Sequence, residues 1–175
     1  MATFRSALRG IAPHYTSPSQ ALEQLNKVIY PDIREDMFIS AIYAHLDHQS
    51  GKVSLARAGH NPAYYFKNES QEIHKVKPPG LAVGIDPGLV FGQVLRDHEI
   101  EMNSGDSLLL YTDGIIEAFN QHKEEFSSAR LEDIVQNHGG AGARELGKII
   151  LDEVANFVQG APQSDDITLV VIEKL

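Results

Sequence analysis

The chain has 175 residues, no cysteine, and 24 Asp and Glu against 15 Lys and Arg, which gives a formal net charge of −9. This length suits a single domain, the acid excess disfavours binding to nucleic acid or anionic lipid, and the lack of cysteine excludes disulfides and thiolate metal sites. No apolar stretch is long enough to span a bilayer or to form a secretory signal, so we expect a cytoplasmic protein.

Two helices are predicted before the first strand. Met1–Ile11 carries apolar residues at helical spacing, but no residue caps its start. Ser17 is a candidate N-cap with Pro18 at the first helical position, and the apolar face that follows ends at Pro31.

The apolar period changes to that of strands from Met37 onward. Met37–Leu46 has few polar residues on either face, which predicts a central strand covered on both sides. Turn residues after it predict two further strands, Val53–Ala58 and Ala63–Lys67, in an antiparallel meander. Three more strands are predicted at Glu72–Val76, Val90–Met102 and Ser107–Tyr111.

Helical spacing returns in the C-terminal third of the chain. It is found in Ala129–Asn137 and Ala143–Val158, before a last apolar strand at Ile167–Ile172 that we expect to insert among the earlier strands. This order predicts an α+β fold, with two antiparallel sheets or one strongly bent sheet flanked by helices.

Two acidic sites lie at the ends of predicted strands. Asp113 follows the run Ser107–Tyr111, and Asp165 and Asp166 directly precede the last strand. Carboxylate oxygens of this kind suit hard cations such as Mg²⁺ and Mn²⁺, and Gly114 permits close approach of the backbone to a ligand. The alternative is that Asp113 is a turn residue and the Asp pair an exposed loop, because Asp is a common turn former.

Five stretches carry a resemblance to a known family. They are MFISAIYAHLD at Met37–Asp47, AGHNP at Ala58–Pro62, GLAVGI at Gly80–Ile85, YTDGIIEA at Tyr111–Ala118 and DDITLV at Asp165–Val170. In this order they resemble the stage II sporulation protein E-like serine phosphatases, a bacterial branch of the metal-dependent type 2C (PPM) phosphatase superfamily.

The resemblance implies an antiparallel β-sandwich flanked by helices, with two Mn²⁺ or Mg²⁺ ions at one edge. A hydroxide held by the metals would attack the phosphorus of phosphoserine or phosphothreonine, without a covalent phosphoenzyme. By motif, Asp113 and Asp165 correspond to metal ligands. Asp166 is either a further ligand or a support for the ligands, and Gly114 could offer a backbone carbonyl.

One motif of the family, Gly-Asp-Val-x-Gly-His/Lys-Gly, does not occur in this sequence. Its Asp bridges both metals in the family. We therefore expect residues 1–175 to be the C-terminal portion of one phosphatase domain, weakly active or inactive by itself, from a parent protein with an upstream sensor or receiver domain.

The resemblance also implies the partners. The substrate would be a phosphorylated anti-anti-sigma (STAS) regulator, and exposed sheet edges favour a homodimer. The alternative is a catalytically silent module that binds such a regulator or dimerises to relay a signal.

Overall fold

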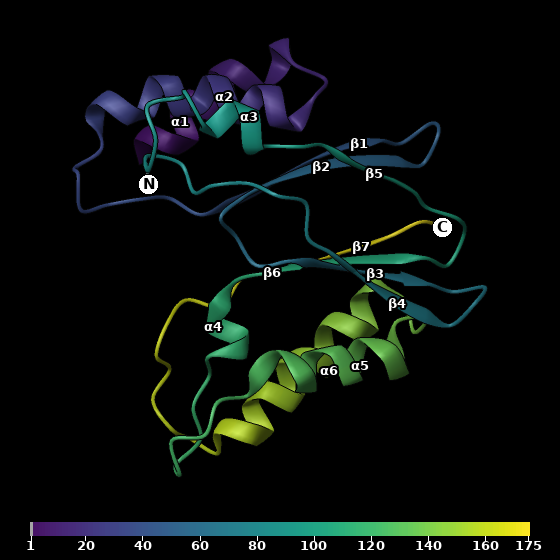
Figure 1. The fold of residues 1–175 in the computed structure, drawn as a ribbon. Coiled ribbons are helices and arrows are strands. Elements are labelled where there is room, and N and C mark those ends of the chain that lie inside the picture. Colours follow the sequence, from purple (N-terminus) through teal and green to yellow (C-terminus); the bar gives the residue numbers. More distant parts are fainter. Residues whose placement is uncertain (1) are drawn as a thin grey trace. The chain divides into compact units, whose positions relative to one another are not determined.

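The structure, a computed structural model, describes residues 2–175, and the chain divides into two compact units (Figure 1). The first unit contains the residues up to His60 together with Lys77–Glu101, and the second contains Asn61–Val76 and Met102–Leu175. Each unit consists of one antiparallel sheet with helices packed against it. Over the described residues, no helix combines the length and the apolar character that crossing a membrane requires.

The first unit has a three-stranded sheet in the order β1-β2-β5, and both neighbouring pairs are antiparallel. Short 3-10 turns follow its first two helices, at Ala12–His14 and Tyr30–Asp32. Its elements are α1 (Ala2–Ile11), α2 (Pro18–Ile29), β1 (Ala41–Asp47), β2 (Lys52–Ala58), α3 (Phe91–Val94) and β5 (His98–Glu101).

Helix α2 begins at the predicted residue because its N-terminus is capped. The Ser17 hydroxyl oxygen accepts a hydrogen bond from the backbone N–H of Gln20 (3.2 Å), and the hydroxyl lies 2.5 Å from Asp97 Oδ2, to which it donates. The apolar face of α2 packs on the sheet and on α3. The core of this unit consists of Leu22, Leu25, Ile29, Ala56, Ala58, Val83, Phe91 and Leu95.

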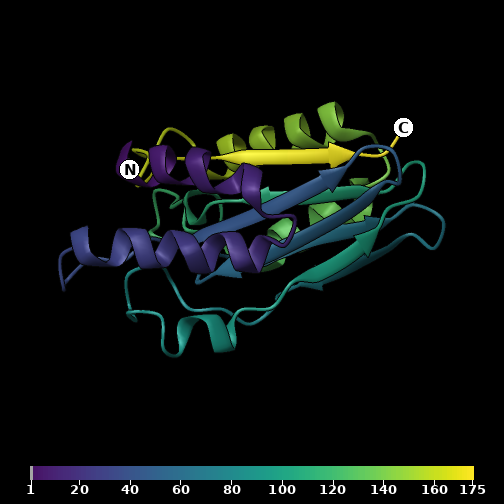
Figure 2. The same cartoon turned by 90° about the horizontal axis from the view of Figure 1, so that it is seen from above.

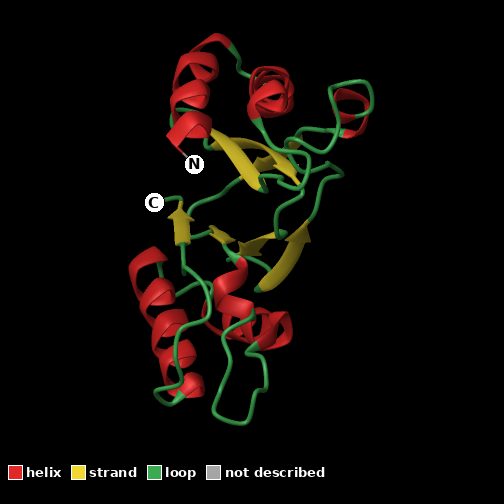
Figure 3. Ribbon diagram, turned by 90° about the vertical axis from the view of Figure 1, so that its left-hand side faces the viewer, coloured by secondary structure: helices red, strands yellow, loops and turns green. Residues whose placement is uncertain are grey.

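The second unit has a four-stranded antiparallel sheet in the order β4-β3-β6-β7, covered by helices on one face (Figure 3). Its elements are β3 (Ala63–Lys67), β4 (Glu72–Val76), β6 (Ser107–Tyr111), α4 (Asp113–Ile116), α5 (Ser127–His138), α6 (Ala143–Val158) and β7 (Leu169–Glu173). The bounds of β3, β4, β6 and α6 agree with the sequence prediction.

The core of the second unit joins one face of this sheet to the apolar stripes of α5 and α6. Within it the rings of Tyr64 and Tyr111, on β3 and β6, stack with their centroids 5.7 Å apart. Burial of such apolar surface is the main term that stabilises the unit. The core residues are Tyr64, Phe66, Leu109, Tyr111, Ile115, Ala118, Phe126, Leu131, Val135, Leu146, Ile150 and Val154.

The predicted α+β class is confirmed, and the structure has two separate antiparallel sheets flanked by helices. The prediction of a central strand over Met37–Leu46 is wrong. Strand β1 begins only at Ala41 and lies at the edge of its sheet, while Met37 and Phe38 are 51% and 63% exposed. An apolar run indicates burial, but it does not specify how many strands lie beside it, and part of this run lines a surface groove.

The predicted meander and the inserted last strand are also wrong. Strands β1 and β2 form a hairpin, but the turn at Gly59–Pro62 leads into the second unit, where β3 pairs with β4 and β6. Strand β7 lies at the sheet edge, paired with β6 on one side and packed against α6 (Figure 2). Turn residues predict that the chain changes direction, but the partner of the next strand depends on distant contacts.

The strand predicted over Val90–Met102 is present only in its second half. The first half contains α3, and the side chain of Asp86 accepts hydrogen bonds from the backbone N–H groups of Gly88, Val90 and Phe91, each at 2.9 Å. A short polar side chain that bonds to nearby backbone in this way competes with strand formation. The strand therefore begins only at His98.

Candidate functional site

The two predicted acidic segments meet because β6 and β7 are antiparallel neighbours. In their register Tyr111, the last residue of β6, pairs with Leu169, the first residue of β7. The segment that leaves β6 and the segment that enters β7 therefore start from the same edge of the sheet. Asp113 belongs to the first of these segments, and Asp165 and Asp166 belong to the second.

Thr112 holds these two segments together. Its backbone N–H donates to the carbonyl of Thr168 (3.0 Å), and its hydroxyl donates to the carbonyl of Asp166 (3.0 Å). The same hydroxyl oxygen accepts a hydrogen bond from the backbone N–H of Thr168 (2.9 Å). Thr112 is not among the site residues predicted from the sequence, although its place between β6 and Asp113 is the feature that could have identified it.

Gly114 allows the segments to approach closely. A Cβ atom at this position would lie 2.5 Å from the carbonyl oxygen of Asp166 and 3.3 Å from that of Asp165. Only a residue without a side chain fits at this distance. The close approach predicted for Gly114 is thus made to the other acidic segment of the same chain.

The three carboxylates themselves are exposed. Asp113 is the first residue of α4, and its carbonyl accepts the backbone N–H of Glu117 (2.8 Å). Asp165 Oδ1 accepts the backbone N–H of Asp166 (2.7 Å), and the carbonyl of Asp165 accepts a hydrogen bond from the Gln163 side chain (2.7 Å). One oxygen of Asp165 therefore bonds to the backbone of its own segment.

The chemistry of these donors fits a hard divalent cation, which binds carboxylate and carbonyl oxygens. Their number is small. Among residues 2–175, no three His, Asp or Glu side chains gather in a group that could hold a metal ion. The structure thus brings Asp113 near the Asp165–Asp166 segment through the backbone, and metal binding by these residues stays a prediction.

The AGHNP segment, Ala58–Pro62, is held in place by a hydrogen bond from Arg57. The Arg57 guanidinium donates to the carbonyls of His60 (2.7 Å) and Pro78 (2.9 Å), and burial lowers the pKa of Arg57. A Cβ at Gly80 would collide with the Arg57 carbonyl oxygen. These contacts hold the turn after β2 against the loop that follows Lys77 in the first unit.

An apolar pocket of about 240 Å³ adjoins the acidic segments in the second unit. Gly114, Gln163 and Ser164 are among the residues that line it, so it touches both segments that carry the acids. The Ser164 hydroxyl donates to the carbonyl of Glu117 (3.3 Å), which links the pocket rim to α4. This pocket was not predicted from the sequence, because its walls come from three separate parts of the chain.

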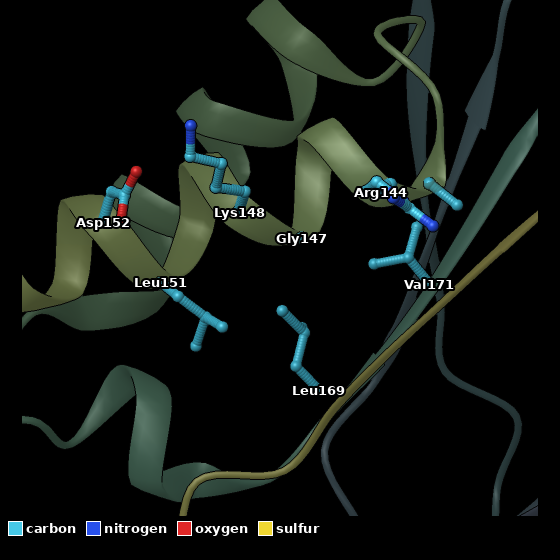
Figure 4. A pocket seen from close by; sticks show the side chains of 8 residues that line it. Arg144, Gly147, Lys148, Leu151, Asp152, Leu169 and Val171 are labelled. Carbon is cyan, nitrogen blue, oxygen red and sulfur yellow. The ribbon is translucent and has the colours of Figure 1, made fainter.

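A second and more open hollow of about 610 Å³ lies between α6 and β7 (Figure 4). Leu169 and Val171 of β7 extend from one side of it, and the helix contributes Arg144 and Lys148. Gly147 faces this hollow, where a Cβ would meet Val171 at an ordinary contact distance of 3.8 Å.

Comparison with known proteins places the chain in a family. Residues 1–174 match the family described as Stage II sporulation protein E (SpoIIE). The chain is 26% identical over 174 residues to the phosphoserine phosphatase RsbU of Bacillus subtilis, which covers 99% of this chain and 50% of the relative. It is 30% identical over 136 residues to Protein IcfG of Synechocystis, which covers 78% of this chain and 20% of that protein.

Solved structures share the fold. The SiaA-PP2C domain of Pseudomonas aeruginosa superposes with a TM-score of 0.79 at 19% identity, over 98% of this chain and 68% of that chain. The phosphatase domain of the cell fate determinant SpoIIE from Bacillus subtilis superposes with a TM-score of 0.70 at 18% identity, over 97% of this chain and 71% of that chain. The chain spans half the length of RsbU and a fifth of that of IcfG. With a match that covers nearly all of its residues, the chain belongs to the Stage II sporulation protein E family.

Proposed function

We propose that the chain is the C-terminal portion of a metal-dependent protein phosphatase domain that removes phosphate from serine or threonine of a regulatory protein in bacterial signalling. The observation that carries this proposal is the junction of the two acidic segments at Thr112 and Gly114. Family membership supports it, since the matched relative RsbU is a phosphoserine phosphatase.

In this proposal Asp113 and Asp165 are ligands in a site for two divalent cations, Mn²⁺ or Mg²⁺. Asp166 either adds a ligand or orients the others, and the Gly114 carbonyl is a further oxygen donor. When bound, such ions supply an activated water and positive charge against the phosphate. A protein of net charge −9 would otherwise repel a dianionic substrate, and the positive charge of the metal ions offsets that repulsion.

We also propose that the 175 residues by themselves have weak activity or none. Two hard cations need more oxygen ligands than three carboxylates and one carbonyl provide. The remaining ligands would come from outside this group.

The substrate that we propose is a phosphorylated regulator of the anti-anti-sigma (STAS) type. We propose that the enzyme acts on it in the cytoplasm. Control by a sensor or receiver domain in the same polypeptide and assembly as a homodimer belong to the same proposal. The family resemblance supports the substrate and the sensor or receiver domain, and the exposed sheet edges support the homodimer.

The test is hydrolysis of p-nitrophenyl phosphate with Mn²⁺, with Mg²⁺ and with chelator. It is made on the chain and, where the gene encodes them, on a form extended by about thirty upstream residues, roughly one supersecondary unit. In the active form we expect Asp113→Asn to lower the rate by more than about 100-fold, because loss of residues that only orient a ligand already costs about 10- to 100-fold. The matched control is Asp133→Asn, which removes an exposed acid on α5 and should leave the rate unchanged.

Titration calorimetry with Mn²⁺ gives a second readout that does not depend on turnover. Asp113→Asn should weaken the binding and Asp133→Asn should not. Activity that survives both chelator and Asp113→Asn would overturn the metal assignment. Absence of hydrolysis in every form and with every metal would instead favour the silent binding module.

A further inference from the structure

The pocket of about 240 Å³ beside the acidic segments is lined mainly by apolar side chains. Large ones come from α6, from the stretch after α4 and from the segment that leads into β7. They are Phe119, Leu151, Val154, Val158, Pro162 and Ile167.

Phe119 and Leu151 are large apolar side chains that remain accessible. Phe119 is 37% exposed and Leu151 is 46% exposed. Exposed apolar side chains gathered around a hollow are typical of a binding site, whereas single ones scattered over a surface are not. The pocket therefore has walls suited to an apolar group from another molecule.

We propose that this pocket binds an apolar side chain of the substrate protein, close in sequence to the residue that carries the phosphate. This inference rests on the proposed phosphatase function. It extends that function by naming a feature that the enzyme recognises in its substrate beyond the phosphate.

Position supports this occupant. Gly114 directly follows Asp113, and Ser164 directly precedes Asp165, and both Gly114 and Ser164 line the pocket. A peptide that brings its phosphate to the acidic segments would therefore have a neighbouring residue at the pocket mouth. The volume is sufficient for one side chain of the size of leucine or phenylalanine.

Charge and polarity at the rim point to the same occupant. Glu117 is exposed, and its carbonyl accepts the hydroxyl of Ser164 at the rim, so an acidic side chain of the substrate would be repelled there. Gln163 adds a polar side chain at the rim. An apolar residue gains by leaving water for these walls, while it avoids the repulsion.

The test uses phosphoserine peptides in which one leucine is moved through the positions on either side of the phosphoserine, in an otherwise constant alanine background. The enzyme is the form that hydrolyses p-nitrophenyl phosphate. We expect one leucine position to raise kcat/KM by about tenfold over the all-alanine peptide, since each methylene group bound in an apolar pocket is worth about tenfold or more. Replacing that leucine by aspartate should remove the gain.

Two variants on neighbouring residues of α6 show whether the pocket causes the preference. Ala155 is exposed and lines the pocket, so Ala155→Leu fills it from the helix surface without opening the core. Asn156 is also exposed but does not line the pocket, so Asn156→Leu is the matched control. The ratio of kcat/KM between the leucine and alanine peptides should fall to near one in Ala155→Leu and stay about tenfold in Asn156→Leu.

The outcomes separate the two proposals. Equal rates on all peptides, with p-nitrophenyl phosphate still hydrolysed, would overturn the pocket assignment and leave the phosphatase function intact. A leucine preference that survives Ala155→Leu would also overturn it. If no form hydrolyses p-nitrophenyl phosphate, the proposed function fails, and the inference that rests on it fails as well.

Discussion

A buried carboxylate, Asp106, organises the turn before β6. It is 1% exposed and accepts hydrogen bonds from the Tyr65 hydroxyl (2.6 Å) and from the backbone N–H groups of Asn103 (2.7 Å) and Asn68 (2.8 Å). Burial raises the pKa of Asp106, but the hydrogen bonds, first the one from Tyr65, lower it, and the net pKa lies below the ordinary value.

We expect Asp106→Asn to lower the free energy of unfolding by about 1 to 3 kcal/mol at pH 7, because the amide leaves buried donors without an acceptor. The folded pKa is depressed, so the stabilisation is complete above the unfolded value of about 4 and is lost as the pH falls through the folded pKa. Urea unfolding followed by circular dichroism should thus show a difference between wild type and variant that shrinks below about pH 4. A difference that stays constant down to about pH 2 would contradict this account.

Gly114 is a second residue at which a single substitution should change the stability of the chain. We expect Gly114→Ala to destabilise the chain by about 1 to 3 kcal/mol, because the new Cβ would lie 2.5 Å from the Asp166 carbonyl oxygen and force the two segments apart. Gly147→Ala on α6 is the matched control. Its Cβ would have 3.8 Å to the nearest atom, so it should be neutral or stabilise by about 0.5 to 1 kcal/mol.

Thermal or urea unfolding of the wild type and both glycine variants measures the difference in their stability. Equal stability of Gly114→Ala and the wild type would show that the acidic segments are not in close contact in solution.

At the scale of elements, the start of α2 depends on one hydroxyl. We expect Ser17→Ala to cost about 1 to 2 kcal/mol, because the Gln20 N–H loses its acceptor and Asp97 loses a donor. The control is Ser6→Ala on α1, an exposed serine within a helix, which should change stability by less than about 0.5 kcal/mol. Chemical unfolding distinguishes the two, and similar losses would argue against the cap.

Local sequence is sufficient to predict the bounds of some helices and strands and insufficient for others. Strand β3 and helix α6 have the predicted bounds, because alternation and the helical stripe act over a few neighbouring residues. In Val90–Met102 the apolar pattern predicted one strand, but the hydrogen bonds of Asp86 produce α3 in its first half. The apolar pattern of Val90–Met102 carries no information about hydrogen bonds to a side chain outside that run, such as Asp86.

At the scale of the whole molecule, each sheet ends in a strand with an unpaired outer edge. Among residues 2–175, β1 pairs only with β2, and β7 pairs only with β6. Unpaired edges are templates for pairing with another chain. We therefore expect the 175-residue chain to self-associate as its concentration rises, and light scattering over a concentration series measures this.

One pair of substitutions tests whether β7 takes part. Val170 on β7 is 44% exposed, and Val170→Lys places a charge on the edge strand, which should shift the chain toward monomer. Leu89→Lys makes the same change of charge in a loop residue that is 77% exposed, and it should leave the association unchanged. A wild-type chain that is monomeric at every concentration would refute the expectation.

The sequence by itself determined most elements, the α+β class, the resemblance to the family and the two acidic segments. These depend on local periodicity, on turn residues and on short motifs. Only the tertiary structure decided that β1 and β7 are edge strands, that Thr112 and Gly114 hold the acidic segments together, and that an apolar pocket lies beside them. The reason is physical: strand neighbours, close backbone approaches and pocket walls are contacts between residues far apart in the chain, and a local pattern does not encode which of them meet.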